Sequence, residues 1–176
     1  DVKCSDVKRA ISSIPPAVVC MQESKLEDVS FFKLFSFLPL NLHSFRFISS
    51  VGASGGIITA WSVADFSLSS FSHDPLLPLF FSSTTSDLSF TISNVYGPCD
   101  SSRKTNFLAE LSSIANFVSG PWVIFGDFNL LRSPSERSNQ NFDSREAEWF
   151  NSWIDVTSLV EIPLLDRLFT WTDNQS

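Results

Sequence analysis

The sequence predicts an α/β fold in which mixed sheets are layered with helices. Two short apolar runs each end in a carboxylate, amphipathic segments flank both runs, and a block of short β-rich pieces lies between them. Short continuous apolar runs indicate strands that are covered on both faces. Their alternation with helical segments and a meander of strands is typical of a layered α/β domain.

Length and composition limit the classes of protein that fit. The 176 residues favour a single domain over 1–176. With 43% hydrophobic and 18% charged residues, the chain is too apolar for intrinsic disorder. The net charge of −7 excludes a general nucleic-acid-coating protein, which would be basic. A local site that holds cations on carboxylates remains compatible with this charge.

The N-terminal part predicts a helix, a strand and a second helix. The first helix is predicted from Ser5, as its N-cap, to Ile14, where two prolines end it. The apolar run 17–21 predicts a buried strand that stops just before Glu23. A second helix is predicted over 26–37.

Short β-rich pieces separated by turn residues follow in the middle of the chain. The side-chain period of two places Asn94 and Tyr96 on one face of the last of them. The predicted strands are 45–49, 56–62, 66–72, 79–83 and 88–96.

The C-terminal part returns to alternating helices and strands. The spacing of apolar residues predicts a helix over 103–118, and 121–125 forms a second buried strand. Asp143 with Glu146 three residues later is a capping-box signature for another helix. A last strand is predicted at 168–171.

The cysteine pattern and the apolar segments bear on compartment. Cys4, Cys20 and Cys99 form no C-x-x-C pair, so zinc binding is not expected and a reducing compartment is. Cys20 lies in an apolar run, which indicates a buried thiol. No signal peptide is visible and segment 31–42 is too short to span a bilayer, so we expect a soluble intracellular protein without a membrane partner.

Polar side chains gather at the predicted ends of three strands. Ligands collect at such positions in open α/β sheets. The residues that occupy them here are Glu23, Asp127, Asn129, Asn94 and Tyr96. Two carboxylates about 4 Å apart repel by roughly 4 kcal/mol at an effective dielectric constant near 20, which a proton or a cation would relieve. Hard oxygen ligands suit Mg²⁺, Mn²⁺ or Ca²⁺, so phosphate-ester hydrolysis is predicted. The alternative is that both carboxylates are ordinary strand-end charges facing solvent.

At these residues the sequence resembles the endonuclease/exonuclease/phosphatase superfamily, which has a DNase I-like fold. Five ordered matches span nearly the whole chain, and the nearest variants are those of LINE-type retrotransposon endonuclease domains, particularly from plants. The matches are Q-E-S-K at 22–25 to Q-E-T-K, S-G-G-I at 54–57, N-V-Y-G-P at 94–98 to N-x-Y-x-P, G-D-F-N at 126–129, and L-F-T-W at 168–171.

The resemblance implies a fold and a role for each matching residue. Glu23 would be the ligand of Mg²⁺ or Mn²⁺, and Asp127 would orient or deprotonate the attacking water. Asn129 would hold the scissile phosphate or that water, and Tyr96 would donate a hydrogen bond to a phosphate oxygen. The implied fold is a four-layer α/β sandwich of two mixed sheets with helices outside.

The implied partner is DNA, with a possible reverse transcriptase in the parent polypeptide and a nuclear location. Basic residues on loops that leave the site could position a nucleic-acid backbone, although solvated surface charge is the alternative for each. For Thr170, the alternative is that its side chain packs in the core. The candidate nucleic-acid contacts are Asn94, Arg103, Arg132, Arg137 and Thr170.

The sequence also departs from the family pattern. It shows no W-N-x-R-G strand before its first helix and no R-x-D or S-D-H segment, and neither His43 nor His73 has the surroundings to replace the missing histidine. We therefore expect an incomplete domain, truncated at both ends, whose activity is low or absent, since each lost group costs about 10²- to 10⁴-fold in rate. The alternative function is an inactive remnant that at most binds nucleic acid or a protein. A phosphatase acting on lipid or inositol phosphates is a third possibility.

Overall fold

The computed structural model describes residues 2–13, 15–52, 54–71, 76, 78–136 and 142–163. The chain forms two compact units. The first comprises Asp1–Tyr96 with Val118–Asp127, and the second comprises Gly97–Phe117 with Phe128–Ser176. That the whole chain forms one domain stays a prediction.

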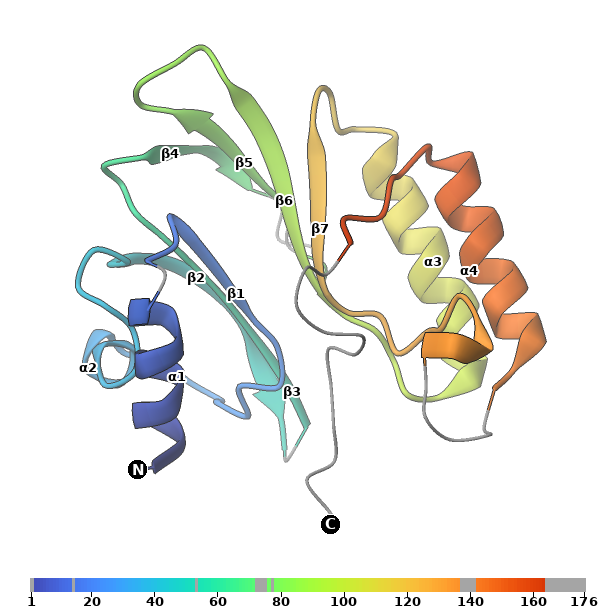
Figure 1. Cartoon of the computed structure of the whole chain (residues 1–176), viewed down its shortest axis with the longest axis horizontal. Helices are drawn as coiled ribbons and strands as arrows, with labels where there is room; N and C mark the ends of the chain where they lie inside the picture. Colours follow the sequence, from blue (N-terminus) through green and yellow to red (C-terminus); the bar gives the residue numbers. More distant parts are fainter. Residues whose placement is uncertain are drawn as a thin grey trace. The chain divides into compact units, whose positions relative to one another are not determined.

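Sheet A of the first unit contains β1 (Val18–Met21), β2 (Ser44–Val51) and β3 (Ser54–Trp61) in the order β1-β3-β2. Both described pairings are antiparallel, whereas a mixed sheet was expected. The connection between β2 and β3 is too short for a parallel crossover, which requires a dozen residues or more. Helices α1 (Val2–Ser13) and α2 (Phe31–Phe35) lie on one side of this sheet (Figure 1).

Sheet B of the first unit is mixed, as expected. Strands β4 (Phe66–Phe71), β5 (Pro78–Ser83) and β6 (Ser89–Tyr96) pair in antiparallel fashion, and β7 (Trp122–Asp127) pairs in parallel with β6. These bounds lie close to the predicted ones. The two sheets pack face to face, with β3 against β6 and β1 against β7 (Figure 1).

Aromatic and aliphatic side chains fill the space between the two sheets. The rings of Trp61 and Phe81 meet edge to face with centroids 5.2 Å apart, and Leu79 and Ile92 complete the buried cluster. Burial beside this cluster raises the pKa of the Cys20 thiol to about 12, although a hydrogen bond with Thr59 partly opposes the rise. By its exposed area Cys20 is half-buried, so it is less enclosed than the buried thiol that was expected.

A second cluster packs the helices against the outer face of sheet A. Leu34, Leu38 and Leu42 are fully buried against Ile58 and Ala60 of β3. Because one face of the sheet contacts sheet B and the other contacts this cluster, the central strand β3 is buried on both sides.

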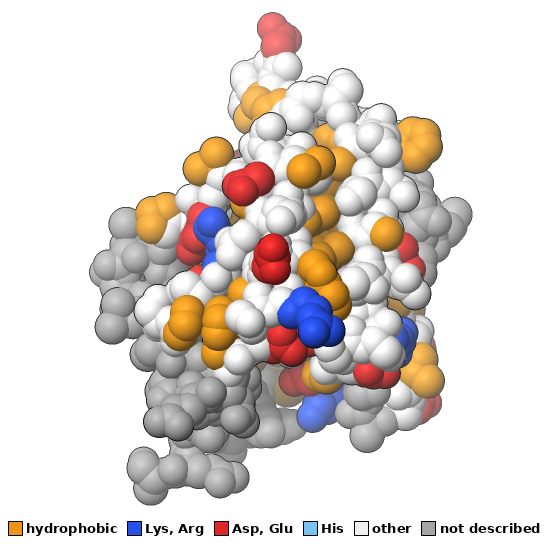
Figure 2. All heavy atoms as spheres, turned by 90° about the vertical axis from the view of Figure 1, so that its right-hand side faces the viewer, with side chains coloured by type: hydrophobic (Ala, Val, Ile, Leu, Met, Phe, Trp, Pro, Cys, Tyr) orange, Lys and Arg blue, Asp and Glu red, His pale blue; other side chains and the backbone are white. Residues whose placement is uncertain are grey.

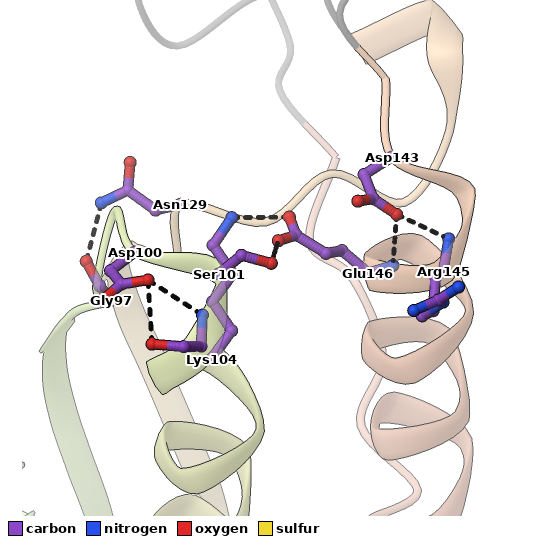
Figure 3. A network of polar contacts seen from close by, with 9 residues as sticks. Gly97, Asp100, Ser101, Lys104, Asn129, Asp143, Arg145 and Glu146 are labelled. Atoms are coloured by element: carbon purple, nitrogen blue, oxygen red, sulfur yellow. Dashed lines mark hydrogen bonds and ion pairs between the residues drawn. The ribbon is translucent and has the colours of Figure 1, made fainter.

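The second unit contains α3 (Ser101–Ala115), the short 3₁₀ helix η1 (Pro134–Glu136) and α4 (Ser144–Val156). The indole of Trp153 donates to the Ser112 hydroxyl at 3.1 Å, and the Phe128 ring packs on Phe150. The two helices lie side by side, and their N-terminal ends are at the same end of the pair (Figure 3).

Three sequence predictions about these elements were wrong. Helix α1 begins at Val2, before the predicted cap Ser5. Cys4 also packs against the cluster on the outer face of sheet A, which extends the helix toward the N-terminus. Helix α2 is much shorter than 26–37, because Ser30 caps it by accepting a hydrogen bond from the Lys33 N–H. Strand β1 lies at an edge of the described sheet A and is half-buried, instead of being covered on both faces.

The remaining element predictions have mixed outcomes. Asp143 caps α4 as predicted, but the carboxylate of Glu146 bonds to Lys104 and does not close a reciprocal box. The strand predicted at 168–171 lies outside the described residues. None of the helices in the described ranges has the length and hydrophobicity that a membrane span needs.

Replacing Phe81, which is 1% exposed between the sheets, tests the inter-sheet core. Phe81→Ala should lower the free energy of unfolding by about 3–5 kcal/mol, because it removes apolar contacts and leaves a cavity. Phe32→Ala is the matched control, since Phe32 is 92% exposed, and it should change that free energy by less than about 0.5 kcal/mol. Equal denaturant midpoints for the two variants would contradict this packing.

Candidate active site

The ends of β6 and β7 bring two of the predicted site residues together. In the parallel register Tyr96 is paired with Asp127, and Ile92 with Val123. Paired residues of neighbouring strands point to the same face of a sheet. Because Ile92 belongs to the cluster between the sheets, Tyr96 and Asp127 both project from the face of sheet B that meets sheet A.

Glu23 reaches the same place from the end of β1. The Tyr96 hydroxyl donates a hydrogen bond to the Glu23 carboxylate at 2.6 Å. Glu23 and Asp127 are both exposed, while Tyr96 is half-buried. The structure thus gathers three of the four residues to which catalytic or metal-binding roles were assigned at one end of the first unit.

The segment that carries Glu23 has an unusual backbone conformation. Glu23 and Lys25 have φ angles of 52° and 55°, a left-handed region that costs a non-glycine residue on the order of 1 kcal/mol or more. Two backbone hydrogen bonds hold the segment, from the Ser24 N–H to the Gly56 carbonyl at 3.0 Å and from the Lys25 N–H to the Gly55 carbonyl at 3.1 Å. The backbone of the S-G-G-I motif therefore holds the backbone of the Q-E-S-K motif in place by hydrogen bonds.

Two glycines allow close backbone approaches at this end of the unit. A Cβ on Gly56 would collide with the Ser24 hydroxyl and lie 3.1 Å from the Lys25 nitrogen. A Cβ on Gly126, whose φ is 143°, would collide with the Val95 carbonyl of the neighbouring strand. A larger residue at either position would displace the strand end or loop that bears an acidic side chain.

Asn94 is placed differently from what the sequence suggested. It is 1% exposed, and its Nδ2 donates to the Ile58 carbonyl and the Thr59 hydroxyl, both at 3.0 Å. The same nitrogen lies 3.4 Å from the Met21 carbonyl, and Oδ1 accepts from the side chain of Gln22. The prediction that Asn94 contacts nucleic acid was wrong, because this buried amide is fully engaged between the two sheets.

Asn129 belongs to the second unit. Its φ is 51°, and its Nδ2 donates to the Gly97 carbonyl at 2.7 Å (Figure 3). This bond joins the loop after β7 to the turn after β6. One side-chain N–H of Asn129 therefore already has a structural acceptor.

The second unit has a hollow of about 490 Å³ that Asn129 helps to line. An ion pair on its wall joins Lys104 Nζ to Glu146 Oε2 at 2.6 Å, and the Ser101 hydroxyl also donates to Glu146 (Figure 3). Lys104 is only 7% exposed. The sequence groups Lys104 with Arg103 as a possible contact to a nucleic-acid backbone. Its burial in an ion pair was not predicted, although Lys104 lies three residues before Phe107, on the buried stripe of α3.

The expected basic contacts differ in their surroundings. Arg132 donates to the Asn151 side chain at 2.9 Å and pairs with Glu161, so its guanidinium joins the loop after β7 to α4 and the segment that follows. Arg103 is exposed on α3. Arg137 and Thr170 lie outside the described residues.

Arg103 lies three residues after Asp100, the N-cap of α3. Nearby, hydrogen bonds from the Ser102 N–H and hydroxyl lower the pKa of the Asp100 carboxyl, and the Arg103 charge adds to the effect. On the face drawn in Figure 2, the basic side chains are scattered among acidic and hydrophobic ones. On that face (Figure 2) the positive charges of the described residues are separate from one another.

The donor chemistry of the first unit fits a hard divalent cation. Among the described residues no group of three His, Cys, Asp or Glu side chains gathers as a metal cluster. Mg²⁺ does not require one, since it is usually held by one or two carboxylates with waters and substrate oxygens. Glu23 is an exposed carboxylate that meets this requirement, and its neighbours Tyr96 and Asp127 offer only oxygen atoms.

Solved structures with a similar arrangement of elements include an AP endonuclease and an endonuclease/exonuclease/phosphatase. An AP endonuclease from Leishmania major superposes with a TM-score of 0.66 at 14% identity, over 89% of this chain and 62% of its own. The catalytic domain of APE2 from Xenopus laevis gives 0.61 at 15% identity, over 86% and 64%. The fold is DNase I-like.

An endonuclease/exonuclease/phosphatase from Bacteroides vulgatus also superposes, with a TM-score of 0.55 at 15% identity, over 79% of this chain and 63% of its own. The chain thus spans just under two thirds of the length of these three structures. No protein-family model and no curated protein matches the sequence. At these identities the similarity is one of fold.

Substituting Gly56 tests the close contact between Gly56 and the segment that carries Glu23. Gly56→Ala should cost about 1–3 kcal/mol more in free energy of unfolding than Gly55→Ala, because its added methyl group collides with Ser24. Gly55 is the matched control: its φ is 78°, close to the 86° of Gly56, but a Cβ there meets nothing within 4 Å. Chemical denaturation of both variants measures the difference, and equal losses would contradict the close approach.

The partly buried ion pair of the second unit gives another test. Lys104→Met should lower the free energy of unfolding by about 1–3 kcal/mol, because it leaves the half-buried Glu146 carboxylate without its cation. The control is Arg9→Met, which breaks the exposed pair with Asp6 and should cost less than about 1 kcal/mol. Thermal and denaturant unfolding would measure both, and an Arg9→Met loss as large as that of Lys104→Met would refute the distinction.

Proposed function

We propose that this chain hydrolyses phosphodiester bonds of DNA with Mg²⁺ or Mn²⁺, as a nicking endonuclease domain of LINE-retrotransposon type. The observation that carries the proposal is the hydrogen bond between Tyr96 and Glu23 beside Asp127. Its support is that three strand ends supply two exposed carboxylates and a phenol to one place. The DNase I-like fold of nuclease structures agrees with it.

Asp127 acts on the attacking water. Its exposed carboxylate accepts a proton as the water oxygen forms a bond to phosphorus. One phosphorus–oxygen ester bond breaks, and the departing oxygen takes a proton from solvent. The products are a phosphate monoester and a free hydroxyl group, which together form a nick in one strand.

Tyr96 and Glu23 prepare the place where the phosphate binds. A phenol is a neutral donor near pH 7, so Tyr96 can donate either to Glu23 or to a phosphate oxygen. Glu23 would hold the metal ion, which when bound supplies Lewis-acid polarisation of the phosphoryl group. Asn129, two residues after Asp127 in the chain, would hold the scissile phosphate or the water.

DNA binding would rest on few positive charges. Arg103 is the described candidate whose exposed position suits a phosphate contact, and Arg132 would have to give up part of its hydrogen bonding. With a net charge of −7, the affinity for DNA should be modest and should fall steeply with salt. The LINE assignment, a linked reverse transcriptase and a nuclear location rest on the motif resemblance alone.

A second candidate function is nucleic-acid or protein binding without catalysis. The observation that favours it is that two residues with implied roles already make structural hydrogen bonds, Asn129 to the Gly97 carbonyl and Arg132 to the Asn151 side chain. An ion held by Glu23 with water alone would bind weakly. In that case the chain would retain the DNase I-like architecture and no hydrolytic activity.

Nicking of supercoiled plasmid in Mg²⁺ or Mn²⁺ tests the proposal. Glu23→Gln and Asp127→Asn should each lower the rate by at least about 100-fold, because each removes a charged group that acts at the reacting phosphate. Asp87→Asn and Glu110→Gln are the matched controls, and both should nick at the wild-type rate. Asp87 is exposed just before β6, whose opposite end carries Tyr96, and Glu110 is exposed on α3.

Equal nicking by wild type and by both site variants would identify a contaminating nuclease and end the proposal. Absence of nicking, together with no rise in melting temperature in millimolar Mg²⁺, would support the non-catalytic alternative. Faster hydrolysis of a phosphoinositide than of plasmid would instead indicate a phosphatase with the same site.

A further inference from the structure

We propose that Gln22 and Asn94 form a positioning pair that sets the location of Glu23 from inside the fold. The inference deepens the proposed function, because it concerns how the site carboxylate is held. Neither residue needs to contact substrate. Both act through the segment that carries Glu23.

The first step is that the orientation of the Asn94 amide is fixed by its surroundings. Carbonyl oxygens only accept hydrogen bonds, and Asn94 faces the carbonyls of Ile58 and Met21. Its NH₂ group must therefore point toward sheet A. The Asn94 oxygen is consequently left to accept a hydrogen bond, and the side-chain NH₂ of Gln22 donates it.

The second step is that this amide pair links both sheets at the site. Asn94 lies on β6 of sheet B, while Met21 ends β1 and Ile58 and Thr59 lie on β3 of sheet A. Met21 and Ile58 are themselves register partners. A single buried side chain thus fixes the point at which β1 ends and the segment with Glu23 begins.

The third step concerns the backbone of Glu23. Its φ of 52° is unfavourable for a residue with a side chain, so the surrounding structure must hold it. Gln22 is anchored immediately before Glu23, and Ser24 is anchored to Gly56 immediately after it. Without the Gln22 anchor, the short link between Met21, where β1 ends, and Ser24 would lose its hydrogen bond to sheet B, and Glu23 could relax.

The chain offers its own reporter for this arrangement. Tyr96 is the only tyrosine in the sequence, and its hydroxyl bonds to Glu23. Labelling with 3-fluorotyrosine therefore gives one ¹⁹F resonance, which responds to the position of the Glu23 carboxylate. Added Mn²⁺ broadens the same resonance when it binds beside Tyr96, which reports metal binding without any substrate.

The experiment compares Gln22→Met and Thr59→Val with wild type. Gln22→Met keeps the side-chain size and removes the donor to Asn94, while Thr59→Val removes one acceptor that holds Asn94. Both should displace the ¹⁹F resonance, and in Gln22→Met the Mn²⁺ concentration for half-broadening should rise by about 10- to 100-fold. Asn106→Ala is the control, since Asn106 is an exposed amide on α3, and its resonance should match wild type.

Nicking by the double variant separates positioning from general stability. Gln22→Met alone should reduce the rate by about 10- to 100-fold, yet add nothing on the Glu23→Gln background, because it acts through Glu23. Resonances that stay at the wild-type position in both Gln22→Met and Thr59→Val overturn the inference. If wild type does not nick plasmid but the resonances move, the proposed function fails and the positioning pair stands.

Discussion

Parallel pairing of β6 with β7 is the constraint on which the candidate site depends. The register sets Tyr96 beside Asp127, so a neutral donor and a carboxylate project from one face of sheet B. Parallel neighbours need a long connection, and here it contains α3. The same pairing explains Gly126, since only a residue without a Cβ allows β7 to approach the Val95 carbonyl this closely.

Polar groups at the site end are placed mainly by the packing between the two sheets. Asn94 is buried among groups of sheet A, and every described hydrogen bond of its side chain joins it to β1, β3 or the residue after β1. A buried amide with unmatched donors or acceptors would be costly, so the satisfied arrangement is strongly preferred over alternatives in which the sheets slide. Rigidity of this kind lets an exposed residue such as Glu23 hold an unfavourable backbone angle.

Local patterns were enough to predict the strands and the residues at their ends. The alternation in 88–96 and the apolar runs before Glu23 and Asp127 are short-range features, and the structure has strands there. The extent of α2 could not be predicted, because the capping of Ser30 competed with an apolar periodicity that continues on both sides. The hydrogen-bond partners of Asn94 could not be predicted either, because they lie far from Asn94 in the sequence.

Lys104 and Glu146 show a different limit of sequence reading, because each is an ordinary charged residue until α3 and α4 are brought together. A partly desolvated pair of this kind is shielded little by dissolved ions, whereas long-range attraction to a polyanion declines quickly as ionic strength rises. Concentrated salt should therefore strip adventitious nucleic acid from the protein during purification while the helical unit keeps its shape.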